Sequence, residues 1–204
     1  MYIARIIYPI NVLGPGTRIG IWFAGCTHGC KGCSNPELWA RDVKYMVDCR
    51  QVMSLVHSIA DYNQVEGITI TGGDPLEQPE ALRELLPELN SITADILLYT
   101  GYTFDQILGK YEDILQNVAV VIDGPYVESL NHGESLRGST NQNIIILKKQ
   151  YTDLYARYMR DSAGQIQNFF QTNGFISVGI HRPNFEKELE IIMKKKGFIK
   201  DEGN

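Results

Sequence analysis

The feature that most constrains the fold is an alternation of short, apolar, β-branched runs with amphipathic helical patterns. Strand-like runs occur at residues 18–24, 67–71, 96–100, 118–122 and 144–147. Apolar residues recur at helical spacing in residues 52–62 and 79–89. Strands that alternate with helices predict an α/β fold with a parallel sheet, which connects right-handedly and can curl into a full or partial barrel.

Glycine and polar residues follow each of the first four predicted strands. They are Gly25 with a cysteine-rich loop, Gly72-Gly73-Asp74-Pro75, Gly101-Tyr102 and Asp123-Gly124-Pro125. The carboxyl ends of parallel strands meet at one edge of the sheet, and this edge is where such sheets bind ligands. We therefore expect the four loops to face one shared site. The alternative is that they are simply turns, in which Gly, Pro and Asp are common.

Composition excludes several function classes. The chain has 204 residues and a net charge of −5, without the basic excess that attracts nucleic acid. Its longest apolar runs, such as residues 118–122, fall far short of the roughly 20 residues that span a bilayer, and no signal-type segment opens the sequence. We expect one main domain, a cytoplasmic location, and no nucleic-acid or membrane partner.

Three of the four cysteines lie within eight residues, at Cys26, Cys30 and Cys33, whereas Cys49 stands apart. Such a cluster is typical of metal or iron–sulfur ligation, because thiolates select zinc and iron–sulfur centres. The three thiolates could hold three corners of a [4Fe-4S] cluster and leave the fourth iron without a ligand from this motif. An open iron can chelate a small molecule, which makes the cluster a catalyst.

Two other sites could use these cysteines. One is a structural zinc completed by His28, although zinc sites favour paired Cys-x2-Cys ligands and His28 lies between two of the cysteines. The other is an electron-transfer cluster completed by Cys49, which we expect instead to be an ordinary semi-buried thiol. Asp74, in the glycine loop, is suited to accept an ammonium group, such as the charged end of an amino acid.

Six sequence blocks, in order across residues 8–147, resemble the S-adenosylmethionine radical enzymes. The closer resemblance is to the small activating proteins of anaerobic ribonucleoside-triphosphate reductase. The blocks are Gly14-Pro15-Gly16-Thr17-Arg18, Gly25-Cys26-Thr27-His28-Gly29-Cys30-Lys31-Gly32-Cys33-Ser34-Asn35, Gly72-Gly73-Asp74-Pro75-Leu76, Tyr99-Thr100-Gly101-Tyr102, Asp123-Gly124-Pro125-Tyr126-Val127 and Arg137-Gly138-Ser139-Thr140-Asn141-Gln142.

The resemblance implies a partial (βα) barrel of the radical type and a set of site residues. It implies a [4Fe-4S] cluster on Cys26, Cys30 and Cys33, which are also the catalytic residues. S-adenosylmethionine would bind the open iron, with Gly72, Gly73 and Asp74 at its amino group. Gly32, Cys33 and Ser34 would lie beside the nucleoside, and Thr100 and Asp123 would touch the ribose or methionine portion.

The implied reaction is reductive cleavage of S-adenosylmethionine, followed by formation of a glycyl radical on a partner enzyme. The implied partner is the anaerobic ribonucleotide reductase, and the implied electron donor is reduced flavodoxin or ferredoxin. Two alternatives remain at this point. The chain could modify a peptide or a nucleoside precursor with the same radical, or it could be a non-catalytic zinc or electron-transfer protein.

The resemblance covers roughly residues 8–147. We expect residues 1–147 to form the core and residues 148–204 to form a C-terminal α/β extension packed on it. Here we expect one or two helices over residues 151–170, a strand over 175–180 and a helix over 185–193. The extension could close the open side of the barrel, form a homodimer contact or recognise a different partner. Within the core, Gly32 occupies a position that is commonly aromatic and packed on adenine in the broader superfamily.

Overall fold

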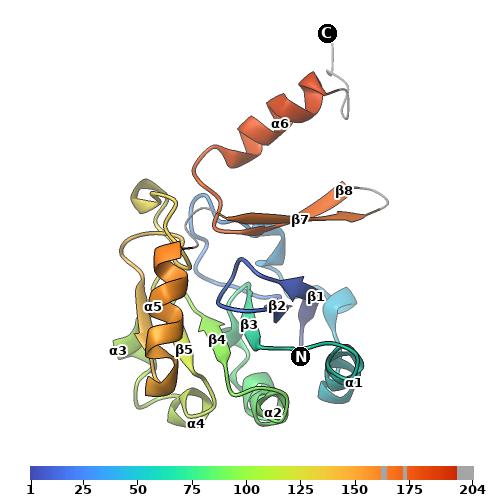
Figure 1. The fold of residues 1–204 in the computed structure, drawn as a ribbon, viewed down its shortest axis with the longest axis vertical. Coiled ribbons are helices and arrows are strands. Elements are labelled where there is room, and N and C mark those ends of the chain that lie inside the picture. The colour runs from blue at the N-terminus through green and yellow to red at the C-terminus, as the bar shows by residue number, and fades with distance from the viewer. Residues whose placement is uncertain (162–164, 172–173, 197–204) are drawn as a thin grey trace.

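The computed structural model describes residues 1–161, 165–171 and 174–196, and its main element is a six-stranded mixed sheet. The strands follow one another across the sheet in chain order (Figure 1). They are β1 (Ile3–Ile10), β2 (Arg18–Phe23), β3 (Gly67–Gly72), β4 (Ile96–Tyr99), β5 (Val120–Asp123) and β6 (Asn143–Ile146). Strands β2 to β5 are parallel, whereas β1 and β6 run antiparallel at the two edges. The expected α/β class with parallel strands is confirmed.

Two amphipathic helices cover one face of this sheet, α1 (Cys49–Ala60) and α2 (Pro79–Asn90). Helix α1 begins at a reciprocal cap, in which Asp48 accepts from the Gln51 amide at 2.8 Å and Gln51 accepts from the Asp48 amide. The leucines of α2 that recur at helical spacing are all fully buried: Leu82, Leu85, Leu86 and Leu89. Each buried leucine stabilises the fold by about 1.5–3 kcal/mol. Sequence periodicity therefore predicted both helices correctly.

Between β4 and β5 the chain forms two single-turn helices, α3 (Phe104–Ile107) and α4 (Glu112–Leu115), which the sequence analysis did not predict. The edge strand β1 was also missed. It pairs with β2 irregularly, with register shifts between Ile3 and Arg5 and between Ile7 and Ile10, and Pro9 lies inside it. Proline and bulges are tolerated at a sheet edge, and they obscure the alternation that identifies a strand.

A buried ion pair closes the amino ends of the parallel strands. Arg18, at the start of β2, is fully buried and donates to Asp95, which precedes β4, at 2.8 Å. It also donates to Thr69 and to backbone carbonyls. Tyr155 completes the group by donating to Asp95 at 2.7 Å. Because every charged oxygen and nitrogen has a partner, the pair is tolerated in the interior.

The chain after β6 forms α5 (Thr152–Asp161), a hairpin of β7 (Ile166–Gln171) and β8 (Gly174–Gly179), and α6 (Phe185–Lys195). The expected strand over 175–180 and the helix over 185–193 are confirmed. The expectation of helix over 151–170 is correct only for α5. Residues 166–170 place apolar side chains at Ile166, Phe169 and Phe170, a spacing that fits a helix, yet they pair with β8 as a strand. Pairing with β8 therefore outweighed the helical spacing of the apolar residues in this segment.

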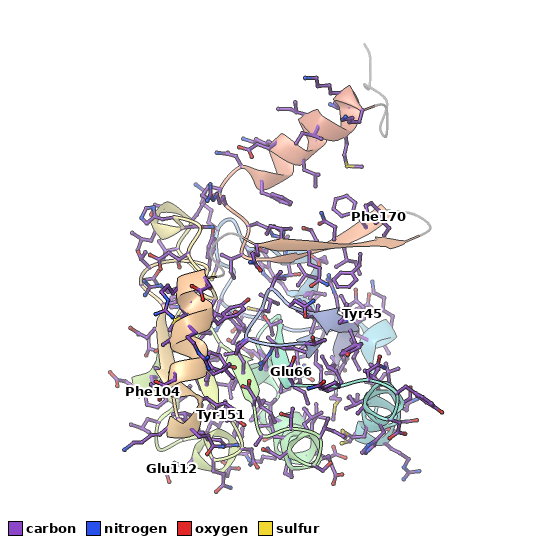
Figure 2. The ribbon with its side chains drawn as sticks, viewed as in Figure 1. Tyr45, Glu66, Phe104, Glu112, Tyr151 and Phe170 are labelled. Carbon is purple, nitrogen blue, oxygen red and sulfur yellow. The ribbon has the colours of Figure 1, made fainter. Side chains whose placement is uncertain are left out.

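The hairpin is a separate two-stranded sheet that lies against β1 and β2, and α6 extends beyond it (Figure 1). Phe170, on the hairpin, is 86% exposed (Figure 2). On the opposite side Val178 is buried with Ile10 and Trp22. None of the helices in the described part of the chain is both long and apolar enough to cross a membrane.

Candidate functional site

The cysteines lie on a loop that leaves the carboxyl end of β2 and is closed at its base. The Gly25 amide donates to the Leu38 carbonyl at 2.7 Å, and the Cys26 amide donates to the Trp39 carbonyl at 2.9 Å. Within the loop, the Cys33 amide donates to the Cys30 carbonyl. These contacts hold a segment with little regular structure in one conformation, so the three thiols are positioned by backbone hydrogen bonds.

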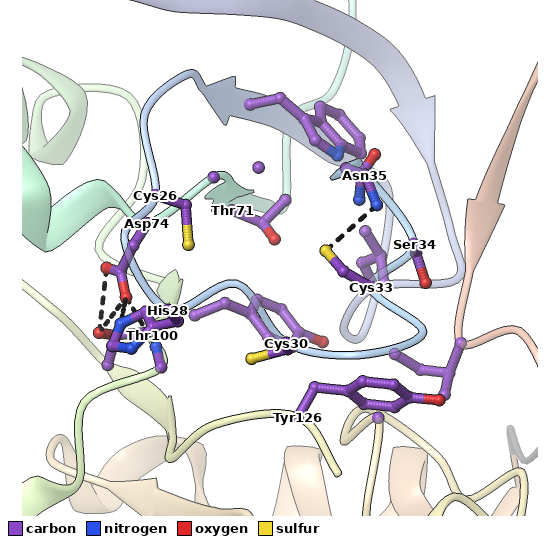
Figure 3. A pocket seen from close by; sticks show the side chains of 18 of the residues that line it. Cys26, His28, Cys30, Cys33, Ser34, Asn35, Thr71, Asp74, Thr100 and Tyr126 are labelled. Carbon is purple, nitrogen blue, oxygen red and sulfur yellow. Dashed lines mark hydrogen bonds and ion pairs between the residues drawn. The ribbon is translucent and has the colours of Figure 1, made fainter. Parts of the chain in front are cut away.

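All three thiols line one cavity of about 190 Å³ at the carboxyl ends of the parallel strands (Figure 3). The cavity walls come from every loop that the sequence analysis grouped together. Eight of the predicted site residues line it: Cys26, Cys30, Cys33, Ser34, Gly72, Gly73, Asp74 and Thr100. The structure thus brings together side chains separated by more than seventy positions in the sequence.

Asp74 connects three of these loops at one end of the cavity. It is 1% exposed, and its carboxylate accepts from the Gly101 amide at 2.8 Å and from the Thr100 hydroxyl at 3.1 Å. His28, between two of the cysteines, lies with Nε2 2.8 Å from the same carboxylate. This hydrogen bond raises the pKa of His28. The carboxylate therefore fixes the cysteine loop to the ends of β3 and β4.

The glycines around Asp74 allow this close packing. Gly72 has a φ of +112°, and a Cβ there would lie 2.3 Å from the Phe23 carbonyl oxygen. A Cβ on Gly101 would lie 2.5 Å from the His28 ring. The sequence analysis placed Gly72 and Gly73 at the amino group of a bound S-adenosylmethionine. The structure shows that Gly72 first of all leaves room for the backbone of β2.

Comparison with known proteins identifies the family to which this loop belongs. A family model described as a 4Fe-4S single cluster domain matches residues 12–145. The anaerobic ribonucleoside-triphosphate reductase-activating protein of Enterobacteria phage T4 is 35% identical over 144 residues, covering 68% of this chain and 90% of the relative. The proteins of the same name from Haemophilus influenzae and Escherichia coli K12 are 33% and 30% identical, with 93% and 92% of the relatives covered.

The chain belongs to this family of activating proteins. The matched region contains the cysteine loop, strands β2 to β5 and all but the last residue of β6, whereas β1 precedes it. It ends before α5, so the hairpin and α6 of this activating protein lie outside the part that the family model describes.

The cysteine loop of this activating protein fits a [4Fe-4S] cluster better than a single metal ion. The three cysteine thiols face one cavity. In the described part of the chain, no three His, Cys, Asp or Glu side chains are grouped as ligands of a single ion. His28, the ligand considered for zinc, is directed to Asp74. Burial raises the pKa of the Cys26 thiol.

Cys49 lies away from this cavity. It opens α1, is buried in the main core cluster, and its Sγ lies 3.9 Å from the Glu84 carbonyl of α2. Burial raises the pKa of this thiol as well. Cys49 is therefore part of the helix packing in this activating protein and is not placed to complete a cluster.

Two of the predicted site residues do not line the cavity. Asp123 is buried and accepts from the Phe104 amide at 2.6 Å and from the Asn143 amide at 2.9 Å, so it holds the loops after β4 and β5. Gly32 faces Glu128, and a Cβ added at Gly32 would lie 2.9 Å from that carboxyl group. Roles for these residues in ligand binding stay predictions.

Sequence reasoning missed a second connection around Glu77. Its carboxylate accepts from the Thr27 hydroxyl of the cysteine loop and from the Tyr102 hydroxyl at 3.0 Å. Arg41 donates to the Glu77 backbone carbonyl. Burial and the contact with Glu77 raise the pKa of Tyr102 to about 12. The only sequence signal was the position of Glu77 three residues after Asp74, which by itself predicts a turn.

Proposed function

We propose that this chain is a radical-generating activase that cleaves S-adenosylmethionine and forms a glycyl radical on an anaerobic ribonucleoside-triphosphate reductase. The observation that carries the proposal is the convergence of Cys26, Cys30 and Cys33 on one cavity whose other walls are the glycine loop and Asp74. Its relatives' names supply the partner.

The cluster would be held by the three cysteine thiolates. When bound, a [4Fe-4S] cluster with one open iron supplies a low-potential electron and a coordination site for an amino acid. Gly73 and Asp74 border the cavity at the end where the methionine portion of S-adenosylmethionine would lie. Asp74 already accepts four hydrogen bonds from the protein, from Leu76, Thr100, Gly101 and His28. Its main contribution to binding the amino group is therefore to hold these loops in place.

The overall chemistry balances with one electron from an external donor. That electron breaks the bond between sulfur and the 5′ carbon and gives methionine and a 5′-deoxyadenosyl radical. The radical takes the Cα hydrogen atom of a glycine in the partner, which leaves 5′-deoxyadenosine and a glycyl radical. A cavity lined by the loops at the strand ends favours this sequence because it limits the contact of the radical with water.

Several finer features belong to the same proposal. We infer that the six-stranded sheet is a partial barrel of the radical type, with residues 1–147 as the radical core and residues 148–204 as an extension packed on it. Reduced flavodoxin or ferredoxin is the expected electron donor, the cytoplasm is the expected location, and a homodimer is one expected assembly.

The test is to mix anaerobically reconstituted protein with the anaerobic reductase of the same organism, S-adenosylmethionine and a reductant. We expect a glycyl doublet in the electron paramagnetic resonance spectrum of the reductase. The Cys33→Ala variant should give none, whereas Cys49→Ala, a matched change at the buried thiol outside the cavity, should give the wild-type signal. A wild-type protein that forms 5′-deoxyadenosine but no doublet would overturn the assignment of the partner.

A further inference from the structure

The segment after the family match forms one wall of the cysteine cavity. Residues 177–181, at the end of β8 and in the turn that follows, line the cavity that contains the three thiols. This segment lies beyond residue 145, where the match to the family model ends. The site of this chain therefore includes residues that the matched region does not contain.

The wall is fixed to the core by apolar and polar contacts. Val178 is 3% exposed and packs in the cluster that contains Trp22, another cavity residue. The side chain of Gln167, which pairs with Val178 across the hairpin, accepts from the Asn11 amide at 3.0 Å and donates to the Pro9 carbonyl at 2.8 Å. These contacts hold the hairpin against the end of β1.

A third connection reaches the wall from the loop after β5. Asn131 is buried and donates to the His181 carbonyl at 2.7 Å and to the Tyr126 hydroxyl at 3.0 Å. Tyr126 belongs to the matched region and lines the cavity. The wall and the family core are thus joined directly at the site.

The cavity has two chemically different ends. Asp74, His28 and Thr100 lie together at one end, and Ser34 and Tyr126 lie at the other, as Figure 3 shows. If the methionine portion of S-adenosylmethionine occupies the Asp74 end, its nucleoside extends toward Ser34 and Tyr126. We propose that the hairpin supplies the wall of the nucleoside subsite, with Ser177 and His181 as its polar contacts. This inference rests on the proposed function and adds residues to the same site.

The chemistry of the wall suits an adenosyl group. Ser177 and His181 are hydrogen-bonded at 2.8 Å, and the His181 ring stacks on Phe185 with centroids 4.3 Å apart. A hydroxyl and an imidazole can exchange hydrogen bonds with ribose hydroxyls or with a purine edge. Tyr126 and Val178 add aromatic and apolar surface, which a base requires. A nucleoside is favoured over a partner peptide because these groups border the cavity that contains the cysteines.

The experiment measures binding to anaerobically reconstituted protein with the complete chain. Equilibrium dialysis gives the Kd of S-adenosylmethionine and, separately, the Kd of L-methionine for the wild type and for Ser177→Ala and His181→Ala. Matched controls are Ser129→Ala and His132→Ala, which change exposed residues outside the cavity. Iron content and circular dichroism confirm that each variant is folded and loaded.

We expect each wall variant to raise the Kd of S-adenosylmethionine by about tenfold, because a hydrogen bond to the ligand is lost. The Kd of methionine should stay at the wild-type value, and both controls should bind like the wild type. The double variant, Ser177→Ala with His181→Ala, should lose less binding free energy for S-adenosylmethionine than the sum of the two single variants, because the two side chains contact each other.

Three results would overturn the inference. Unchanged S-adenosylmethionine binding with a weaker glycyl signal would assign the wall to the partner protein. If the variants bind S-adenosylmethionine and methionine more weakly by the same factor, or lose iron, the wall would only stabilise the site as a whole. A wild-type protein that binds no S-adenosylmethionine would instead overturn the proposed function, and the nucleoside subsite with it.

Discussion

The two ends of the parallel strands each contain a buried carboxylate, and the two are satisfied in opposite ways. At the amino ends, Asp95 is paired with the permanent cation of Arg18 and with Tyr155, and the group is closed. At the carboxyl ends, Asp74 is satisfied mainly by neutral donors from three loops, beside an open cavity. Each end of the sheet is ordered by its own aspartate, but only the carboxyl end leaves space for a ligand.

The difference shows how one sheet separates stability from function. A charged pair without solvent access stabilises the interior only while both partners remain. A carboxylate that accepts from backbone amides and a hydroxyl instead fixes loop geometry without bringing a permanent positive charge near the cysteines. We therefore expect changes at the amino ends to affect unfolding, and changes at the carboxyl ends to affect iron retention and ligand binding.

The largest effect on stability is expected for Arg18→Met. The variant leaves Asp95 buried without its cation, and we expect the free energy of unfolding to fall by about 3–5 kcal/mol. Urea denaturation followed by circular dichroism measures this change. Arg50→Met, at an exposed arginine, is the control. A loss below about 1 kcal/mol would show that the amino ends do not depend on this pair.

A smaller loss of stability but a larger effect on the site is expected for Asp74→Ala. The change leaves buried amide and hydroxyl donors without an acceptor, at a cost of about 2–3 kcal/mol. Because His28 loses its partner, the cysteine loop is less fixed and iron should be lost faster to a chelator. The control is Asp61→Ala, at an exposed aspartate. Wild-type iron retention in the folded variant would contradict the positioning role of Asp74.

A still smaller effect is expected for Tyr155→Phe, which removes only the hydroxyl that donates to Asp95. The hydrogen bond goes to a charged group, so the expected loss is about 1.5–2 kcal/mol. Iron content and S-adenosylmethionine binding should match the wild type, since Tyr155 lies at the opposite end of the strands. Impaired ligand binding in a stably folded variant would show that the two ends are coupled.

The smallest effect concerns alkaline pH. The pKa of Tyr102 is raised to about 12 from 10.0, and burial raises the pKa of Tyr155 further. Both tyrosines keep their protons in the folded chain at pH values where the unfolded chain loses them. The contribution of these two tyrosines to the free energy of unfolding is therefore fully present below pH 10, and it falls as the pH rises from 10 toward 12.

Urea midpoints measured at several pH values above 9 test this sign. Tyr155→Phe should flatten the alkaline slope more than Tyr102→Phe, because Tyr155 is the more deeply buried. Tyr62→Phe, at an 87% exposed tyrosine, should leave the slope unchanged. Equal slopes in all variants would contradict the assigned pKa shifts.

Local patterns predicted most of the core, because β2 to β5, α1 and α2 each carry their own periodicity. Local patterns failed where the structure of a segment depends on partners that are distant in sequence. Arg18 and Asp95 are 77 positions apart, and nothing near either residue indicates the pair. The same reason explains the wrong prediction for β7: its apolar spacing fits a helix, but its pairing with β8 makes it a strand.

The site was predictable to the same degree. The cysteine spacing and the rule for strand ends, with the family resemblance for Ser34 and Thr100, placed eight residues that the structure finds around one cavity. Asp123 was grouped with them because it follows a strand, but its side chain is used by neighbouring loops. The wall formed by Ser177 and His181 could not be predicted, because its position depends on how a separate hairpin packs against β1.

The most direct test of the account is product formation by the reconstituted protein. Anaerobically loaded wild type should contain about four irons and four sulfides per chain and, with reductant, should convert S-adenosylmethionine to 5′-deoxyadenosine. Cys30→Ala should form none of this product, and Cys49→Ala should form it at the wild-type rate. A fully loaded wild type that yields no 5′-deoxyadenosine, or a Cys30→Ala variant that still yields it, would contradict the central claim.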